Sequence, residues 1–220
     1  MEMPAYLEVI HQPHFLTNKL KWSKVDLLSA AEKATVSQPG WPIGVCLTKD
    51  EAKPRAMQFG IRAKIKKQID DGYDYWELHE DGKFYFMRIL EEELPKWKEA
   101  HELHFDTRIK RTFEALLHCR NLYSELGLDP ENTVHFHINL YGLKNRILSS
   151  LNPERRRSLS DKCEEEKHEF FKVLSPKLIE TDAKAITYEI TKNLFELFNF
   201  FRYQKTLNDD VIDKFLKRQE

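Results

Sequence analysis

The sequence predicts an α+β fold in which a twisted, mainly antiparallel sheet packs against two long helices. In 60–65 and 133–141, apolar and polar residues alternate, which is typical of strands with one buried face. In 106–126 and 182–201, apolar residues recur every three to four positions, which is typical of helices that bury one broad face. The Asp-Gly pair at 81–82 indicates a tight hairpin between two strand-like runs.

The first part of the chain combines short strands with one short helix. Residues 5–10 predict a strand that ends before Pro13, because proline has no backbone donor for a sheet. Ser23 is a good N-cap, and the apolar spacing that follows it predicts a helix over 24–34. The apolar run 41–47 predicts a buried strand.

The most distinct local signal is the hairpin. Aromatic-rich runs at 73–78 and 83–90 flank the Asp-Gly pair, which supplies the positive φ that tight turns require. Together with the alternating run at 60–65, they predict three or four antiparallel strands. The intervening residues 48–57 carry several charges and Pro54, and they predict a loop.

Two long helices are predicted in the second half, one on each side of the strand at 133–141. Asp106 or Thr107 can cap the start of the first helix. Gly127 marks its end, because glycine readily adopts the left-handed conformation that terminates helices. Asp182 is the predicted cap of the second helix.

The remaining segments are polar or terminal. The charged stretch 152–169 predicts a flexible excursion, with a further helix beginning near Ser160. A short helix is predicted after Asn208. We therefore expect a single α+β domain over 1–205 and a C-terminal helical tail over 206–220.

The composition is that of an ordinary globular chain, and its net charge gives no overall electrostatic attraction for nucleic acid. Of 220 residues, 41% are hydrophobic, and 35 basic against 36 acidic side chains give a formal net charge of -1. Three widely spaced cysteines favour reduced thiols over disulfides or a zinc site. We find no membrane-spanning run, signal peptide or glycine-rich phosphate loop, so we expect a cytoplasmic protein with no membrane contact, metal or cofactor.

His135, His137 and Asn139 are the candidate catalytic residues. Because side chains alternate along a strand, these three project from one face, where imidazoles can act as metal ligands or as an acid–base pair. A metal would need a further ligand from elsewhere. The alternative is a polar, half-exposed sheet face, opposite the face that carries Phe136 and Ile138.

Basic residues form a second candidate site, for nucleic acid. If they converge with Tyr73, Tyr75 or Trp76, phosphates pair with cations while bases stack on rings. The alternative is that the aromatic residues face the core and the lysines keep the strand soluble. The basic candidates are Arg62, Lys64, Lys66 and Lys67 near one strand, and Arg155, Arg156 and Arg157 in the charged stretch.

The acidic run at 91–93 follows the hairpin. Adjacent carboxylates can bind magnesium for phosphoryl chemistry. The run lacks the lysine-containing step of a nuclease strand, and solvated surface is the more typical role of such a run. We therefore predict solvated surface here.

Three segments carry a family resemblance: GWPIGVCL at 40–47, YDYWELHEDGKFYFMRIL at 73–90 and HFHINLYGLKNRIL at 135–148. They resemble the C-terminal accessory region that follows an AlbA-like, Schlafen-type DNA-binding domain in uncharacterised bacterial proteins. The resemblance covers most of 5–201 and its motifs are structural. It implies that nucleic-acid chemistry belongs to the preceding domain, so no catalytic residue is carried over to this chain.

These observations favour a non-catalytic recognition or accessory module over an enzyme. Its partner would be a protein, a nucleic acid contacted locally, or a second copy of the chain. Self-association would use an apolar patch around Phe215 and Leu216. The alternative function is a phosphodiester hydrolase or nuclease built around His135 and His137.

Overall fold

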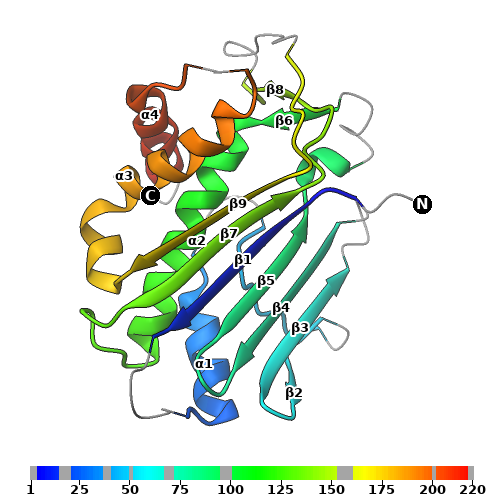
Figure 1. The fold of residues 1–220 in the computed structure, drawn as a ribbon. Helices are drawn as coiled ribbons and strands as arrows, with labels where there is room; N and C mark the ends of the chain where they lie inside the picture. Colours follow the sequence, from blue (N-terminus) through cyan, green and yellow to red (C-terminus); the bar gives the residue numbers. More distant parts are fainter. Residues whose placement is uncertain are drawn as a thin grey trace.

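A computed structural model of the chain describes residues 4–14, 21–36, 41–49, 52–66, 72–94, 101–152, 161–199 and 202–217. Within these ranges, seven strands form one antiparallel sheet with helices packed against it, so the predicted α+β class is confirmed (Figure 1). The strands are β1 (Tyr6–Pro13), β2 (Arg55–Met57), β3 (Gly60–Lys66), β4 (Tyr73–His79), β5 (Phe84–Ile89), β7 (Val134–Tyr141) and β9 (Lys167–Leu174). Across the sheet their order is β2-β3-β4-β5-β1-β7-β9.

The N-terminal strand lies inside the sheet and joins its two halves. β1 pairs antiparallel with β5 on one side and with β7 on the other. Tyr6 therefore lies opposite both Ile89 and Tyr141. The hairpin of β4 and β5 and the later pair of β7 and β9 thus become one continuous surface, as Figure 1 shows.

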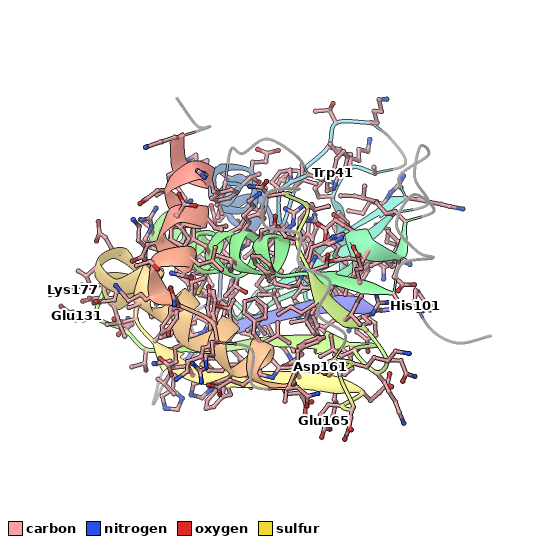
Figure 2. All side chains as sticks on the ribbon, turned by 90° about the horizontal axis from the view of Figure 1, so that it is seen from above. Trp41, His101, Glu131, Asp161, Glu165 and Lys177 are labelled. Carbon is pink, nitrogen blue, oxygen red and sulfur yellow. The ribbon has the colours of Figure 1, made fainter. Side chains whose placement is uncertain are left out.

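Four described helices lie on the same side of the sheet, as the view from above shows (Figure 2). They are α1 (Lys24–Ala34), α2 (Phe105–Glu125), α3 (Pro176–Glu196) and α4 (Lys205–Leu216). α2 contacts each of the other three helices, and its Ile109 and Leu116 are fully buried. None of the described helices has an apolar stretch long enough to cross a membrane.

The C-terminal helix packs onto the other helices. α4 contacts α2 and α3, and its Val211 and Ile212 are buried. The rings of Phe113 and Phe215 meet edge to face, with centroids 6.1 Å apart. This contact covers Phe215, which the sequence placed in a self-association patch. The predicted boundary between 205 and 206 stays a prediction.

Two short strands lie at the end of the sheet opposite the β4–β5 turn. β6 (Glu102–His104) pairs in parallel with β8 (Ile147–Ser149), and the 3-10 helix η1 (Glu91–Glu93) precedes β6. In Figure 1 this pair lies at the top of the molecule.

Local signals in the sequence predicted several elements correctly. α1 covers the predicted residues, and Ser23 Oγ accepts a hydrogen bond from Asp26 N at 3.2 Å as its cap. Gly82 in the hairpin turn has a φ of +80°, and Gly127 after α2 has a φ of +71°. Both glycines therefore adopt the positive φ that their positions require.

The apolar run 41–47 is not a strand, contrary to the prediction. Gly44 has a φ of +67°, a left-handed conformation that interrupts an extended chain. Side chains occupy the place of a neighbouring strand: Arg88 donates to Trp41 O at 2.9 Å and to Pro42 O at 3.0 Å. The segment is held by a buried cation rather than by a β ladder.

Two predicted helix starts in the second half are also wrong. α3 begins at Pro176 rather than at Asp182, and Ser175 Oγ caps it by accepting a hydrogen bond from Leu178 N at 3.1 Å. Ser160 lies outside the described residues, but the predicted helix does not follow it, because 167–174 forms β9 and pairs with β7.

Smaller differences affect the remaining boundaries. The predicted loop 48–57 contains the short edge strand β2. α2 begins one residue before Asp106, which does not cap it in the predicted way. The Asp106 carboxylate instead accepts hydrogen bonds from Ser150 Oγ at 3.1 Å and Leu151 N at 3.2 Å, and so ties α2 to the segment after β8.

Candidate nucleic-acid interface

One face of the sheet is covered by none of the described helices. In β7, for example, His135 and His137 are half-exposed, while Phe136 and Ile138, which alternate with them, are buried on the helix side. We call the outward-facing side chains the open face. They are Tyr6, Glu8, Ile10 and Gln12 of β1, Arg62, Lys64 and Lys66 of β3, Tyr73, Tyr75, Glu77 and His79 of β4, Tyr85, Met87 and Ile89 of β5, His135, His137, Asn139 and Tyr141 of β7, and Lys167, Glu169, Phe171 and Val173 of β9.

The strand register places both predicted sites on this one face. The basic strand β3 and the histidine-bearing strand β7 are four strand spacings apart, which corresponds to about 19 Å. One row across the sheet contains, in order, Arg62, Glu77, Tyr85, Ile10, His137 and Phe171.

Tyrosine rings form two of the aromatic groups on the open face. Tyr6 and Tyr141 stack, with centroids 4.5 Å apart. Tyr75 and Tyr85 meet edge to face at 6.2 Å. Partial burial, together with the nearby Glu77 carboxylate, raises the pKa of Tyr75 to about 12. This phenol therefore stays protonated at neutral pH and presents a neutral ring with a polar tip.

A third aromatic group surrounds Phe171 near the β9 edge. Its ring centroid lies 4.6 Å from that of His137 and 5.6 Å from that of His135. His135 also contacts the ring of His14 at 4.7 Å. Partial burial and the neighbouring His135 lower the pKa of His137, so its imidazole is mostly neutral at pH 7.

Exposed cations line the opposite edge of the open face. Lys64 Nζ lies 6.0 Å from the centroid of the Tyr75 ring, and Tyr73 lies opposite Lys66. The basic strand and these two tyrosines therefore converge as the nucleic-acid hypothesis requires, whereas Trp76 is buried on the helix side. The exposed basic side chains of this edge are Arg55, Arg62, Lys64 and Lys66. The other basic candidates, Lys67, Arg155, Arg156 and Arg157, lie outside the described residues.

The carboxylates of the open face are hydrogen-bonded within it. Glu77 accepts from Tyr75 Oη and pairs with His79 Nε2 at 3.0 Å. Burial alone would raise the pKa of Glu77, but the hydrogen bonds from Tyr75 and His79 lower it overall. Asn139 Nδ2 donates to Glu8 Oε2 at 2.9 Å. Donors within the face thus hold the side chains of Glu77 and Glu8 in place.

The two histidines on β7 contact aromatic rings, His135 that of His14 and His137 that of Phe171. Asn139, the third candidate catalytic residue, donates its side-chain hydrogen bond to Glu8. Among the described residues, no group of three histidine, cysteine, aspartate or glutamate side chains is arranged to hold a metal ion. The hydrolase alternative at His135 and His137 stays a prediction.

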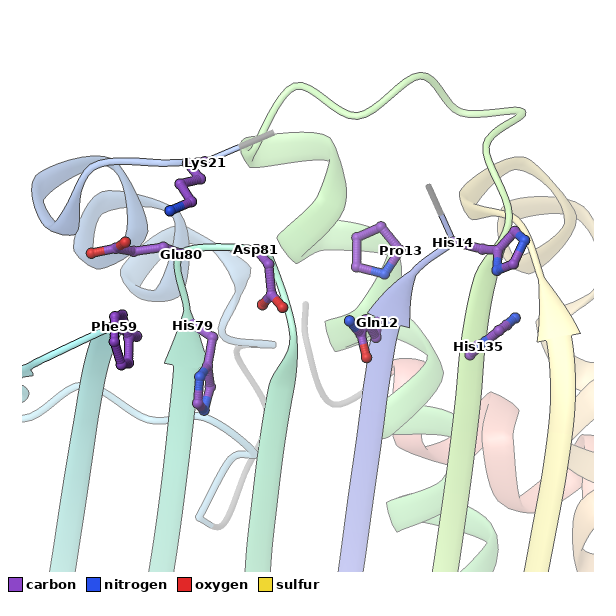
Figure 3. Close-up of a pocket in the computed structure, with 9 residues that line it drawn as sticks. All are labelled: Gln12, Pro13, His14, Lys21, Phe59, His79, Glu80, Asp81 and His135. Atoms are coloured by element: carbon purple, nitrogen blue, oxygen red, sulfur yellow. The ribbon is translucent and has the colours of Figure 1, made fainter. Parts of the chain in front are cut away.

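A pocket of about 570 Å³ lies at the rim of the open face, where β1 ends and β4 turns into β5 (Figure 3). We call it the rim pocket. Of its lining residues, only His135 was a candidate site residue in the sequence. The others come from turns and strand ends far apart in the chain, and the sequence marked Pro13 and Asp81 only as a strand end and a hairpin turn. The lining consists of Gln12, Pro13, His14, Lys21, Phe59, His79, Glu80, Asp81 and His135.

The acidic run at 91–93 is not solvated surface, contrary to the prediction. Glu92 is only 1% exposed. Arg108 donates to Glu91 at 2.6 Å and to Glu92 at 3.1 Å, and Arg111 donates to Glu91 at 2.8 Å. Burial alone would raise the pKa of Glu91, but Arg111 and Arg108 hold it well below its usual range. These carboxylates anchor η1 to α2.

Comparison with known proteins found no family model, curated protein or solved structure that matches the chain. The resemblance to a region that follows AlbA-like domains therefore stays a prediction.

Proposed function

We propose that this chain is a non-catalytic recognition module that binds single-stranded nucleic acid across the open face. The observation that carries the proposal is the interleaving of aromatic rings and cations on one uncovered sheet surface. Bases stack on ring faces, while phosphates pair with lysine and arginine at the margin of such a surface.

The dimensions of the open face favour an unpaired strand over a duplex. Its rings lie within the sheet surface, where only bases freed from pairing can reach them. The groups at Tyr75 and at Phe171 are separated by the width of several strands, so a single strand can cross from the basic edge to the histidine edge. Bound this way, its backbone passes the cations of β3.

A protein partner fits the surface less well. The core of a protein interface is apolar and depleted in charge. Here the exposed large apolar side chains of the open face, Phe171 and Val173, lie together on β9. The half-exposed Ile10, Met87 and Ile89 lie among tyrosine, histidine, amide and charged side chains on the other strands. Polar-tipped rings among cations are typical of nucleic-acid surfaces.

Neutralising two cations of β3 is expected to weaken binding about tenfold or more. In the variant R62Q/K64Q, two phosphate contacts are lost while side-chain size is kept. We expect the slope of log affinity against log salt to become shallower by about 1.4, because each contact with a single strand contributes about 0.7. Fluorescence anisotropy of a labelled, mixed-sequence RNA and of the matching DNA, from about 50 to 200 mM salt, measures both quantities.

The matched control is K192Q/R202Q, which removes the same charge from exposed positions on α3 and after it. This variant should bind like the wild type. If both double variants weaken binding equally, the attraction is a general charge effect and the open face is not the site. If the chain binds neither oligonucleotide at about 100 μM protein, the proposed function is wrong.

Removing one ring tests the stacking part of the proposal separately. Phe171 is 53% exposed, so F171A should retain the fold. Stacking of a base on a ring contributes about 1 to 3 kcal/mol, so we expect a loss of roughly tenfold in affinity with an unchanged salt slope. V25A, which truncates an apolar side chain that is 76% exposed on α1, is the control and should have no effect. Unchanged affinity in F171A would mean that the strand does not reach β9.

A further inference from the structure

The rim pocket continues the open face at one end of the sheet. Gln12, His79 and His135 belong to both, so a strand lying on the rings of β7 and β9 passes the mouth of the pocket. Its volume of about 570 Å³ lies within the range of small-ligand sites and is large enough for one nucleobase with its sugar. Phe59, 59% exposed, forms part of the lining beside His79.

The polar groups of the pocket include a fixed acceptor. Asp81 Oδ1 accepts a hydrogen bond from Lys83 N at 3.0 Å, which holds the carboxylate in the hairpin turn. Gln12, at the end of the neighbouring strand β1, offers an amide with two donors and one acceptor. In Figure 3, Asp81 and Gln12 lie on the same rim of the sheet, with His79 beyond Asp81 and His135 beyond Gln12.

An ionised carboxylate accepts hydrogen bonds and donates none, so it selects among the bases. The Watson–Crick edge of guanine carries two adjacent donor groups, N1–H and N2–H₂, beside the O6 acceptor. Adenine, cytosine and uracil each place an acceptor next to their donor, and a carboxylate repels that acceptor. The Gln12 amide can donate to guanine O6 while Asp81 accepts from its two donor groups.

We propose that the rim pocket binds one unpaired guanine of the strand that crosses the open face, with Asp81 and Gln12 reading its Watson–Crick edge and Phe59 or His79 stacking on its ring. This inference rests on the proposed function, because the open face delivers the strand to the pocket. It adds base preference to a surface whose stacking and phosphate contacts accept any sequence.

The test compares two labelled RNAs of about 12 nucleotides, one of uridines alone and one with a single central guanine. The full chain should bind the guanine-containing RNA at least about tenfold more tightly, as expected for a bidentate contact to a base edge. In D81N the ratio should fall to near one, while affinity for the uridine RNA should not decrease, because the substitution only removes a negative charge from the path of the strand. The asparagine oxygen can still accept from Lys83 N, so the turn is preserved.

D129N is the matched control. Asp129 Oδ1 accepts from Glu131 N at 2.9 Å in a similar turn, but it does not line the pocket. This variant should keep the guanine preference. Q12M gives a second test that leaves the turn untouched, and it should reduce the preference several-fold.

The outcomes separate this inference from the function on which it rests. If neither RNA binds, the proposed function itself fails. If both RNAs bind with equal affinity, or if the preference persists in D81N and Q12M, the open face binds nucleic acid but the pocket does not read guanine. A preference for a different single base, tested with adenine and cytosine in the same position, would also overturn the assignment.

Discussion

Replacing Arg88 with methionine is expected to lower the free energy of unfolding by about 3 to 5 kcal/mol. Arg88 and Asp74 are each 1% exposed, and Arg88 Nε donates to Asp74 Oδ1 at 3.0 Å. The guanidinium also supplies donors to Trp41 O and Pro42 O. R88M leaves a buried carboxylate without its cation and removes those donors from the 41–47 segment. Urea denaturation followed by circular dichroism measures the loss.

A double variant separates charge pairing from packing. In D74L/R88M both charges are absent, and replacing a buried pair by apolar groups is often close to neutral. We expect the double variant to be more stable than R88M, although Pro42 O still loses its donor. K33M is the surface control, because Lys33 and Glu125 pair at 3.3 Å with 62% and 36% of their side chains exposed. It should change stability by no more than about 1 kcal/mol.

Two results would contradict this account. A loss below about 1 kcal/mol in R88M would show that the Asp74 carboxylate does not depend on its cation. Strictly additive effects of D74L and R88M would show that the two side chains do not stabilise the fold as a pair.

The segment 41–47, which was predicted to be a strand and is not one, shows what the sequence alone does not reveal in this fold. Its apolar composition fits a buried strand, and the segment is indeed packed against the core through Ile43. Its backbone partners, however, are side chains far along the chain: Arg88 on β5, and Glu114 on α2, whose Oε1 accepts from Ile43 N at 2.8 Å. No residue pattern within 41–47 predicts that its backbone groups will bond to buried charged side chains instead of to a neighbouring strand.

Elements defined by local chemistry were predicted well. α1 has a serine cap and an apolar stripe, and the β4–β5 hairpin has an Asp-Gly turn, so neighbouring residues determine both. β9 was missed because its side chains are mixed on both faces, and its strand conformation follows from pairing with β7. The acidic run at 91–93 was misread for a similar reason, since its arginine partners lie on α2.

The open face could be predicted strand by strand but not as a whole. Alternation correctly placed His135 and His137 on one side of β7, and Arg62 and Lys64 on one side of β3. That both sides belong to one surface depends on β1, which inserts between β5 and β7. Periodicity within a segment says nothing about this order. The rim pocket is even harder to predict from the sequence, because turns and strand ends form it.

Acidification is expected to destabilise the chain well before its carboxylates titrate, because two histidines are buried in the neutral form. The rings of His11 and His118 are 5.6 Å apart, and that of His118 lies 4.5 Å from the ring of Phe84. His11 Nδ1 hydrogen-bonds Tyr123 Oη at 2.8 Å, whereas neither ring nitrogen of His118 has a hydrogen-bond partner among the described residues. A second proton on either imidazole would place a positive charge in an apolar site.

Burial lowers the pKa of His118 to about 3, and burial and the neighbouring His118 lower that of His11 well below its usual value. The folded state therefore binds these protons less readily than the unfolded state, in which a histidine has a pKa of about 6.5. Their contribution to stability is complete above that value and is lost as pH falls below it. Each histidine contributes up to about 1.4 kcal/mol per pH unit, so the pair can remove up to about 4 kcal/mol by pH 5.

Urea denaturation at about pH 7.5 and pH 5 tests this expectation with H118L. The variant should lose about 2 kcal/mol less stability than the wild type between the two pH values, because the His118 contribution is gone. H14Q, which replaces an exposed histidine, should show the full wild-type loss. An equal loss in H118L and the wild type would show that His118 does not impose the acid sensitivity, and that groups elsewhere, such as His168 with its pKa lowered by burial to about 4, carry it instead.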